Sequence, residues 1–342
     1  KSASGTTHDI NYHHRTIAHN AMLVFDPDEV PVMGEANDGG QRTLKWLNNT
    51  SGYHDVVNDP DYEYGEVLAR DFGEDMNKPD YTYLEGDLTK AYTDKVADYS
   101  RAFMFFNFFD EVYPGALVVF DRVKSSDASF KKTWLLHSQE EPVVEDNKIT
   151  VRRTQYDYNG RLINETLLPK KENAVLTKIG GPGKEYWVNG KNYMALNDTK
   201  GYENGNWRVE LSPKKESEHD YFLNVLQVSD NKLNPEPLKS KYLETDELIG
   251  AQIKDRVAYF GKTKQRSFKK LSIKGEACEY DSLKYVVTGL SEGVWKVYDK
   301  KGKVLKEVIV PENTGVLSFE APAGEYTLKP TPSRETYTKD FN

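Results

Sequence analysis

A histidine and an asparagine stand side by side in an otherwise apolar segment near the start of the chain. The segment, Arg15–Glu29, has apolar residues on both faces of a predicted strand, which is typical of a strand deep inside a sandwich. His19 and Asn20 lie in its middle, and a polar pair inside a buried strand needs a partner. That partner is either structural or chemical. A chemical role would make His19 a metal ligand or a group that neutralises an acidic substrate.

The nearest side chains that could join His19 at a metal are His8, His13, His14 and Asp26. None of them forms a known metal-binding spacing with His19. In an unbroken strand His13 would face the same way as His19, because side chains alternate along a strand. The alternative, two surface histidines at 13 and 14, stays open.

Two further parts of the sequence, a turn and a histidine, have either a ligand-binding role or a purely structural one. The turn Asn37–Arg42 contains two glycines that would let the backbone approach a ligand, and Arg42 would pair with a carboxylate or sulfate through two hydrogen bonds. The alternative is an ordinary loop with a solvated arginine. His137 lies in a predicted core strand, where a hydrogen-bonded structural histidine is the simpler interpretation.

The composition excludes several classes of protein. The 342 residues favour two domains, and a net charge of -8 argues against bulk binding of nucleic acid, although a local basic cleft for an anionic polysaccharide remains compatible with it. The single cysteine, Cys278, rules out an internal disulfide and a cysteine-based zinc site. No run approaches the ~20 apolar residues of a membrane span. The first residues lack the apolar core of a signal peptide, so we expect the chain to start after processing or inside a larger protein.

The elements that must position these residues are predicted to be strands. Residues 45–80 show no sustained period and predict a long excursion with at most a short helix near Tyr64–Arg70. Leu88–Tyr99 fits a helix or a strand, and its context favours a strand. Short strands separated by turns indicate an antiparallel sandwich. The predicted strands of this part are Tyr81–Leu84, Arg101–Phe106, Ala116–Asp121, Thr133–Ser138, Lys148–Arg153, Arg161–Leu168, Val175–Ile179 and Tyr221–Val228.

A change in composition near Leu243–Gly250 predicts a domain boundary, with one domain over residues 1–247 and a smaller β-sandwich over 248–342. The second domain contains Lys-rich strands, and Asp299–Gly302 is predicted to be the hairpin turn between two of them. The predicted fold class is therefore all-β. The strands predicted here are Arg256–Phe260, Ser267–Ile273, Tyr285–Thr288, Val294–Tyr298, Val304–Val310, Gly315–Glu320 and Tyr326–Lys329.

Several motifs in a fixed order resemble those of the heparinase II/III-like polysaccharide lyases, with most similarity to the heparinase II-type branch. The first is Arg-Thr-Ile-Ala-His-Asn at 15–20, followed by an apolar strand and Asp-Pro-Asp-Glu. The other four follow it in the family's order and extend the resemblance over about the first 250 residues. They are Asn-Asp-Gly-Gly-Gln-Arg at 37–42, Tyr-Thr-Tyr-Leu-Glu-Gly-Asp-Leu-Thr-Lys-Ala-Tyr at 81–92, Pro-Gly-Ala-Leu-Val-Val-Phe-Asp at 114–121 and Phe-Lys-Lys-Thr-Trp-Leu-Leu-His-Ser at 130–138.

The resemblance implies a helical toroid, a central antiparallel β supersandwich and a C-terminal β-sandwich. It implies β-elimination on uronic-acid polysaccharides such as heparin or heparan sulfate, with a tyrosine and a histidine as acid and base. Many members hold a zinc ion through two histidines and an aspartate, and His19 matches one of these histidines. Arg15, Asn20, Gln41 and Arg42 are then expected to bind substrate.

The resemblance also implies that the other zinc ligands, the catalytic residues and the toroid lie upstream of this chain, so the supersandwich is truncated on its N-terminal side. One ligand does not hold zinc at useful affinity, so we expect this chain alone to bind no zinc tightly and to show no lyase activity. The expected partner is an acidic polysaccharide rather than nucleic acid or membrane, a homodimer is left open, and the expected location is periplasmic or secreted. The alternative is a non-catalytic carbohydrate-binding or scaffold module that uses Arg15, Arg42 and neighbouring tyrosines.

Overall fold

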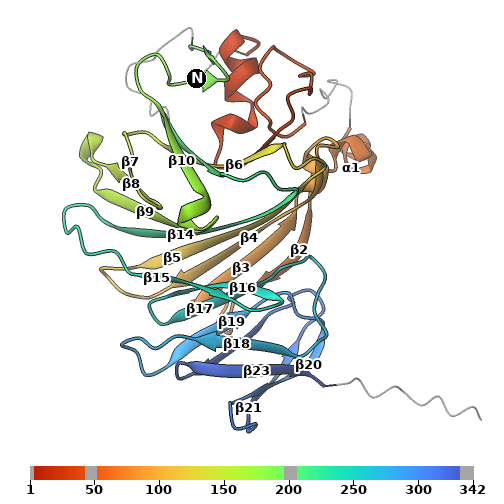
Figure 1. The fold of residues 1–342 in the computed structure, drawn as a ribbon, viewed down its shortest axis with the longest axis vertical. Coiled ribbons are helices and arrows are strands. Elements are labelled where there is room, and N and C mark those ends of the chain that lie inside the picture. Colours follow the sequence, from red (N-terminus) through yellow and green to blue (C-terminus); the bar gives the residue numbers. More distant parts are fainter. Residues whose placement is uncertain (1–3, 43–51, 196–205, 332–342) are drawn as a thin grey trace, which may run out of the picture. The chain divides into compact units, whose positions relative to one another are not determined.

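The computed structural model describes residues 4–42, 52–195 and 206–331 (Figure 1). The chain divides into two compact units. Unit 1 comprises Lys1–Val67 and Glu85–Pro237, and unit 2 comprises Leu68–Leu84 and Leu238–Asn342. Strands dominate both units, which confirms the all-β prediction. None of the helices in the described ranges is long and apolar enough to cross a membrane. The short helical elements are η1 (Asp9–His13), η2 (Thr16–Ala18), α1 (Tyr53–Asn58), η3 (Pro60–Tyr62), η4 (Thr89–Ala91), η5 (Gln155–Asp157) and η6 (Lys171–Asn173).

Unit 1 contains a four-stranded antiparallel sheet and most of a larger antiparallel sheet (Figure 1). The smaller sheet has the order β1-β6-β13-β10, and its strands are β1 (Met22–Phe25), β6 (Lys131–Ser138), β13 (Trp207–Pro213) and β10 (Ala174–Gly180). The larger sheet runs through β4 (Val96–Asn107), β5 (Gly115–Ser125), β14 (His219–Asp230), β9 (Gly160–Leu168), β8 (Lys148–Arg153) and β7 (Val143–Glu145). A hairpin is formed by β11 (Trp187–Val188) and β12 (Lys191–Asn192).

The small sheet is buried on both faces, as the opening segment predicts. Trp134 and Leu136 of β6 belong to a core that also contains Tyr99 and Phe222 of the larger sheet, so the two sheets pack face to face. Leu135, the residue between them in β6, belongs to a second core. That core includes Tyr12, Ile17 and Leu23 from the start of the chain and Tyr186, Val188 and Tyr193 around the β11–β12 hairpin.

The prediction that Arg15–Glu29 forms a single strand is wrong. Only Met22–Phe25 is a strand, and Thr16–Ala18 forms a 3₁₀ turn. The turn is stabilised by side chains that bond to backbone groups in place of a neighbouring strand: Asp38 Oδ2 accepts from the N–H of Ile17 (3.1 Å), and Thr16 Oγ1 accepts from the N–H of Gln41 (2.7 Å). His19 and Asn20 are consequently exposed rather than buried.

Two other local predictions need correction. The segment near Tyr64–Arg70 is not helical, because β2 (Glu66–Asp71) covers most of it and the helix α1 comes earlier in the chain. Leu88–Tyr99 combines both structures that its pattern fits, a 3₁₀ turn at η4 and then the start of β4. The strand β13 belongs to the small sheet but is absent from the predicted set.

Unit 2 is a β-sandwich, as predicted. A single core joins Tyr259, Tyr285 and Phe319 of one sheet to Trp295 and Leu328 of the other. The five-stranded sheet is β15 (Ser240–Glu244), β16 (Leu248–Ile253), β17 (Arg256–Gly261), β19 (Leu283–Val287) and β22 (Leu317–Ala321), with β17 and β19 parallel. The four-stranded sheet is β18 (Leu271–Gly275), β23 (Gly324–Pro330), β20 (Gly293–Tyr298) and β21 (Val304–Val310). The predicted hairpin turn is confirmed, since Asp299 O accepts from the N–H of Gly302 (3.0 Å).

The segment 68–84 belongs to unit 2 although it is far from the rest of that unit in sequence. It carries most of β2 and of β3 (Tyr81–Asp87). The Tyr83 ring packs against that of Phe260 (6.4 Å between centroids), and Asp80 forms an ion pair with Lys284 (2.9 Å). Arg266 donates to the carbonyl of Leu68 (3.0 Å). The second part of unit 2 starts at Leu238, before the boundary drawn from composition at 247/248, so β15 lies on the other side of that boundary. Composition gave no sign of the insertion of 68–84.

Candidate functional site

A small polar cluster, His19, Asn20 and His137, lies beside the point where β1 begins. Asn20 Oδ1 accepts a hydrogen bond from the backbone N–H of His137 (2.8 Å) and lies 3.1 Å from His137 Nδ1. A backbone N–H is always a donor, so the amide oxygen of Asn20 must face it. The Asn20 NH₂ group therefore points away from β6, and both His19 and Asn20 are exposed. Two polar side chains are thus exposed to solvent on the segment that leads into β1.

His137 is neutral at physiological pH because of its surroundings. Burial and the nearby charge of Arg208 lower the pKa of His137 to about 4, although a hydrogen bond with the carbonyl of Ile17 opposes this. Nε2 lies 2.9 Å from that carbonyl, so both ring nitrogens face oxygen atoms. A neutral ring carries one N–H and satisfies only one of them. The local hydrogen bonds therefore favour the charged ring, while burial and Arg208 favour the neutral ring.

A buried ion pair supports the backbone under this cluster. Arg101 binds Asp121 through Nε–Oδ1 (2.6 Å) and Nη2–Oδ2 (3.3 Å), and it donates through Nη1 to the carbonyl of Asn20 (2.9 Å). Tyr99 donates to Asp121 Oδ1 (2.9 Å), and burial raises the pKa of the Tyr99 hydroxyl well above its usual value. Sequence reasoning missed this group. The sequence did contain a signal for it: Arg101 and Asp121 are charged residues that each lie in a predicted core strand.

Arg15, an expected substrate ligand, is engaged within the protein. Its Nε and Nη2 donate to Asp38 Oδ1 (3.2 and 2.8 Å), and Nη2 also donates to the carbonyl of Ala36 (3.2 Å). The side chain of Arg15 is 12% exposed and that of Asp38 is fully buried. These contacts fasten the turn at 37–40 to the start of the chain. The expected role in substrate binding stays a prediction.

Gln41 and Arg42, also expected to bind substrate, lie on the same turn, and neither shares a hydrogen bond with His19 or Asn20 in the described part of the chain. Gln41 bonds Tyr92, whose hydroxyl donates to the carbonyl of Met22 (2.5 Å). Arg42 donates through Nε to the carbonyl of Lys90 (2.8 Å), and its guanidinium lies 4.3 Å from the centre of the Tyr64 ring. Their substrate roles stay predictions as well.

The glycines of the turn approach the protein's own backbone. A Cβ on Gly39 would lie 3.0 Å from Phe25 Cα, and one on Gly40 would lie 2.5 Å from Thr16 Cβ. The N–H of Val24 donates to the carbonyl of Gly39 (2.8 Å). The turn therefore needs glycine to pack against β1, and a ligand is not required to explain it.

The residues present do not assemble a metal site around His19. Within the described ranges, the one group of three or more potential ligand side chains consists of Asp9, His13 and His14, and His19 is not a member. His13 ends the helix η1, so the strand alternation that would align it with His19 does not apply. The zinc site implied by the family resemblance therefore cannot be built on His19 from the described side chains, and no step is assigned to a metal.

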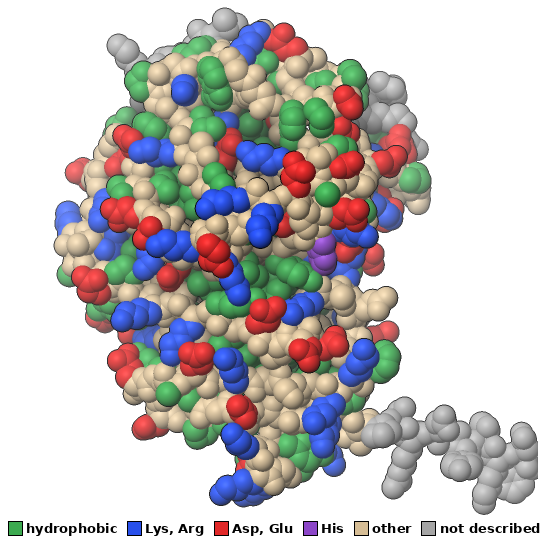
Figure 2. All heavy atoms as spheres, viewed as in Figure 1, with side chains coloured by type: hydrophobic (Ala, Val, Ile, Leu, Met, Phe, Trp, Pro, Cys, Tyr) green, Lys and Arg blue, Asp and Glu red, His purple; other side chains and the backbone are tan. Residues whose placement is uncertain are grey.

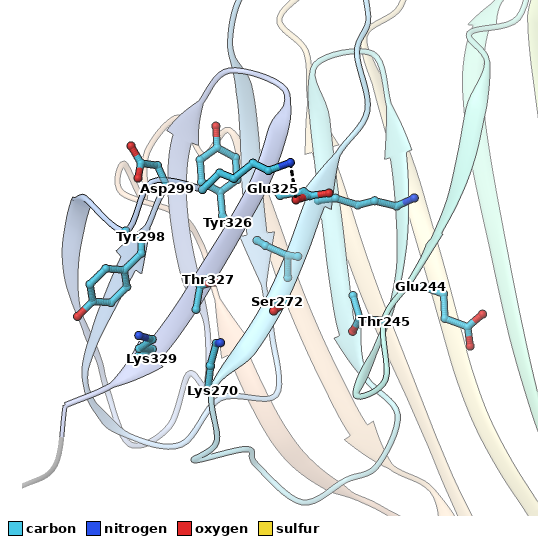
Figure 3. A pocket seen from close by; sticks show the side chains of 14 residues that line it. Glu244, Thr245, Lys270, Ser272, Tyr298, Asp299, Glu325, Tyr326, Thr327 and Lys329 are labelled. Carbon is cyan, nitrogen blue, oxygen red and sulfur yellow. Dashed lines mark ion pairs between the residues drawn. The ribbon is translucent and has the colours of Figure 1, made fainter.

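A groove of about 470 Å³ lies on unit 2, over the outer face of β18, β23 and β20 (Figure 3). Ser272 pairs with Thr327 in the strand ladder, and Thr327 pairs with Tyr298, so three hydroxyl-bearing residues form a row across these strands. Their neighbours Leu271 and Leu328 point into the core. The alternation of the strands thus gives this sheet a polar outer face.

Four lysines and three carboxylates line the groove. Lys300 pairs with Glu325 (3.3 Å), the interaction drawn in Figure 3. Lys270 and Lys329 adjoin the paired residues Leu271 and Leu328, which places them next to each other at one end of the ladder. Neither forms an ion pair with a described carboxylate, and Lys329 Nζ lies 4.7 Å from the centre of the Tyr298 ring. This end of the groove is positively charged.

Comparison with known proteins identifies part of the chain. Residues 242–330 match the family model of the heparinase II C-terminal domain. The solved structure of a heparan sulfate lyase HepC mutant from Pedobacter heparinus is similar to 72% of this chain at 12% identity and a TM-score of 0.42, and the match covers 30% of that chain. A structure of heparinase III is similar to 57% of this chain at 11% identity and a TM-score of 0.38, covering 27% of that chain. No curated protein matches. The chain thus spans less than a third of these solved lyases.

Proposed function

Because residues 242–330 belong to the heparinase II C-terminal domains, we propose that this chain is the β-sheet portion of a polysaccharide lyase that cleaves uronic-acid polysaccharides by β-elimination. The domain match is the observation that carries the proposal. Substrates of this class include glycosaminoglycans and related polymers. Such an enzyme would act outside the cytoplasm, where these polymers occur.

The cluster His19, Asn20 and His137 is the part of unit 1 that suits this chemistry. β-Elimination requires loss of the proton at C5 of the uronate, and neutralising the adjacent carboxylate makes that proton more acidic. The Asn20 NH₂ group is directed outward because its oxygen is held by His137. We assign Asn20 and His19 to the uronate carboxylate, with His137 as the positioning residue for Asn20. No catalytic acid or base is assigned within this chain.

Two substitutions in the longer protein that carries this chain test the assignment. Asn20→Ala removes the outward NH₂ and should lower kcat/KM on a uronate polymer by at least tenfold, measured by the ultraviolet absorbance of the unsaturated product. Asn231→Ala is the control, since Asn231 also accepts from a side chain, Arg152, at a distant point of unit 1. Equal activity of Asn20→Ala and the unmodified protein would refute the role of Asn20 without bearing on the domain match.

A second function, binding of an acidic sugar chain in the groove of unit 2, is favoured by a separate observation. The groove combines a tyrosine ring and hydroxyl groups with two lysines that lack a described carboxylate partner. Basic and acidic side chains are mixed over the face seen in Figure 2. A groove with a positive end would therefore be a local binding site for acidic sugars and not part of a broad basic surface. The expectation that nucleic acid and membranes are not partners stays a prediction.

Affinity electrophoresis in gels containing heparin, alginate or a neutral glycan tests this second function. Lys270→Glu with Lys329→Glu should abolish retardation by the acidic polymers. Lys301→Glu with Lys303→Glu makes the same change of charge at the neighbouring turn, at lysines that do not line the groove, and is expected to weaken retardation less. Equal loss in both double variants, or retardation by the neutral glycan alone, would contradict a specific site for acidic sugars.

A further inference from the structure

A histidine-rich group lies at the first helical turn of the chain, apart from the cluster around His19. Asp9 begins the helix η1, His13 ends it and His14 follows directly. His13 Nδ1 lies 3.3 Å from Asp9 Oδ1, and His14 Nδ1 lies 3.6 Å from Asp9 Oδ2. One ligand atom from each of the three side chains lies within 4.8 Å of the other two. Three groups that commonly bind metals therefore already converge.

The carboxylate of Asp9 is fixed in place. Its side chain is 5% exposed, and Oδ2 accepts a hydrogen bond from the N–H of Gly5 (3.0 Å). Burial raises the pKa of Asp9, whereas this hydrogen bond and the two neighbouring histidines lower it. The lowering effects together are larger, so the pKa of Asp9 lies below its usual value. An ionised carboxylate is the form that binds a cation.

The two imidazoles are presented to solvent. The side chains of His13 and His14 are 54% and 61% exposed, and their ring centroids are 4.9 Å apart. His8 is close by but does not belong to the group of converging ligand atoms; it is buried, and its Nδ1 lies 2.6 Å from the carbonyl of Tyr193. The group thus has a buried anionic side and an open side with two nitrogen atoms.

We propose that Asp9, His13 and His14 bind one divalent transition-metal ion of the zinc class. Bonds of about 2.0–2.1 Å in tetrahedral geometry place ligand atoms about 3.3 Å apart. Each histidine nitrogen lies at a similar distance from one of the two Asp9 oxygens, 3.3 Å from Oδ1 for His13 and 3.6 Å from Oδ2 for His14, so a small shift of the side chains would bring all three ligands to one ion. Two imidazoles and one carboxylate suit zinc, cobalt or nickel, whereas calcium and magnesium prefer oxygen ligands. Solvent or an anionic ligand occupies the fourth position, since the histidines are exposed.

This site differs from the one implied by the family resemblance. It contains no residue assigned to substrate and does not include His19. It also revises the expectation that the chain binds no zinc tightly, because that expectation considered His19 as the ligand. The proposal does not depend on the lyase function.

Titration of the whole chain with Zn²⁺ by calorimetry, and with Co²⁺ by visible absorption, tests the site. One equivalent should bind, with Co²⁺ producing the absorption bands of nitrogen and oxygen ligands. His13→Gln combined with His14→Gln should weaken binding at least 100-fold, and Asp9→Asn at least tenfold. Circular dichroism identifies any variant that fails to fold; because both histidines are exposed, the double variant is expected to fold.

The matched control is His19→Gln, an exposed histidine five residues further on. Binding that survives the double variant but is lost in His19→Gln would overturn the proposal in favour of a site at His19. Zn²⁺ and Ca²⁺ binding with equal affinity, or no binding of either ion at neutral pH, would also overturn it. Unchanged affinity in His19→Gln together with loss in the double variant is the result that supports it.

Discussion

The lowered pKa of His137 makes the stability of this protein depend on pH in a defined window. In the unfolded chain the imidazole titrates near 6.5, and in the folded protein its pKa is about 4 because burial and Arg208 oppose the charged ring. Well above pH 6.5 the ring is neutral in both states, and the contribution of His137 to the free energy of unfolding is fully present. As the pH falls from 6.5 towards 4, the unfolded chain takes up a proton that the folded protein does not, so the free energy of unfolding decreases.

The size of this effect follows from the shift in pKa. Each pH unit within the window costs about 1.4 kcal/mol, so at pH 5 the contribution of His137 amounts to roughly 2 kcal/mol relative to neutral pH. His137→Gln keeps a polar side chain but cannot titrate. We expect it to be less stable than the unmodified protein at pH 7.5, since it loses hydrogen bonds at Ile17 and Asn20, and to lose most of that disadvantage at pH 5.

Urea unfolding followed by tryptophan fluorescence at pH 7.5, 6.5, 5.5 and 5.0 measures this convergence. Ser138→Ala is the control: its buried hydroxyl lies next in the same strand and does not titrate, so its effect should be constant across the series. A constant difference between His137→Gln and the unmodified protein would show that the hydrogen bonds of the charged ring fully offset burial and Arg208, so that the pKa of His137 is the same in the folded and unfolded states. The reasoning about His137 would then be wrong.

Three further substitutions test other parts of the structure. Asp121→Asn leaves the buried Arg101 without its counterion and should cost about 3–5 kcal/mol in urea unfolding, whereas an unchanged midpoint would contradict the buried pair. Gly40→Ala places a Cβ 2.5 Å from a neighbouring carbon and should cost about 1–3 kcal/mol, while Gly86→Ala, with its nearest atom at 3.6 Å, should change stability by less than about 0.5 kcal/mol. In 1 M salt the loss of unfolding free energy caused by Asp121→Asn should persist, because salt screens a buried ion pair only weakly. If that loss disappears in 1 M salt, the Arg101–Asp121 pair is exposed to solvent.

The sequence predicted the strands of unit 2 from Arg256 onwards because their pattern is local, but β15 and β16 are absent from the predicted set. Lys270–Gly275 alternates polar and apolar residues, and the alternate residues point into the core and into the groove. The same rule could have found β13, Trp207–Pro213, whose Trp-Arg-Val-Glu-Leu alternates equally clearly. The insertion of 68–84 into unit 2 depends on contacts such as Tyr83 with Phe260, which no local pattern contains.

The candidate site was harder to predict because long-range hydrogen bonds decide its structure. The apolar run around His19 reads as a strand, but Asp38, some twenty residues later, binds the backbone of Ile17 and holds a 3₁₀ turn instead. Exposure of His19 and Asn20 follows from that turn. Arg15 and Arg42 carry the charge expected of substrate ligands, but their contacts with Asp38 and with backbone carbonyls appear only once the chain is folded.

The formation of unsaturated uronate by the lyase of which we propose this chain to be a part tests the central claim most directly. The assay follows ultraviolet absorbance during incubation with heparin, heparan sulfate, alginate and other uronate polymers, with a neutral glycan as control. The account predicts product from at least one uronate polymer and none from the neutral glycan or from this chain alone. Product from this chain alone would contradict the assignment of the catalytic residues elsewhere, and the absence of product from every uronate polymer would contradict the lyase function.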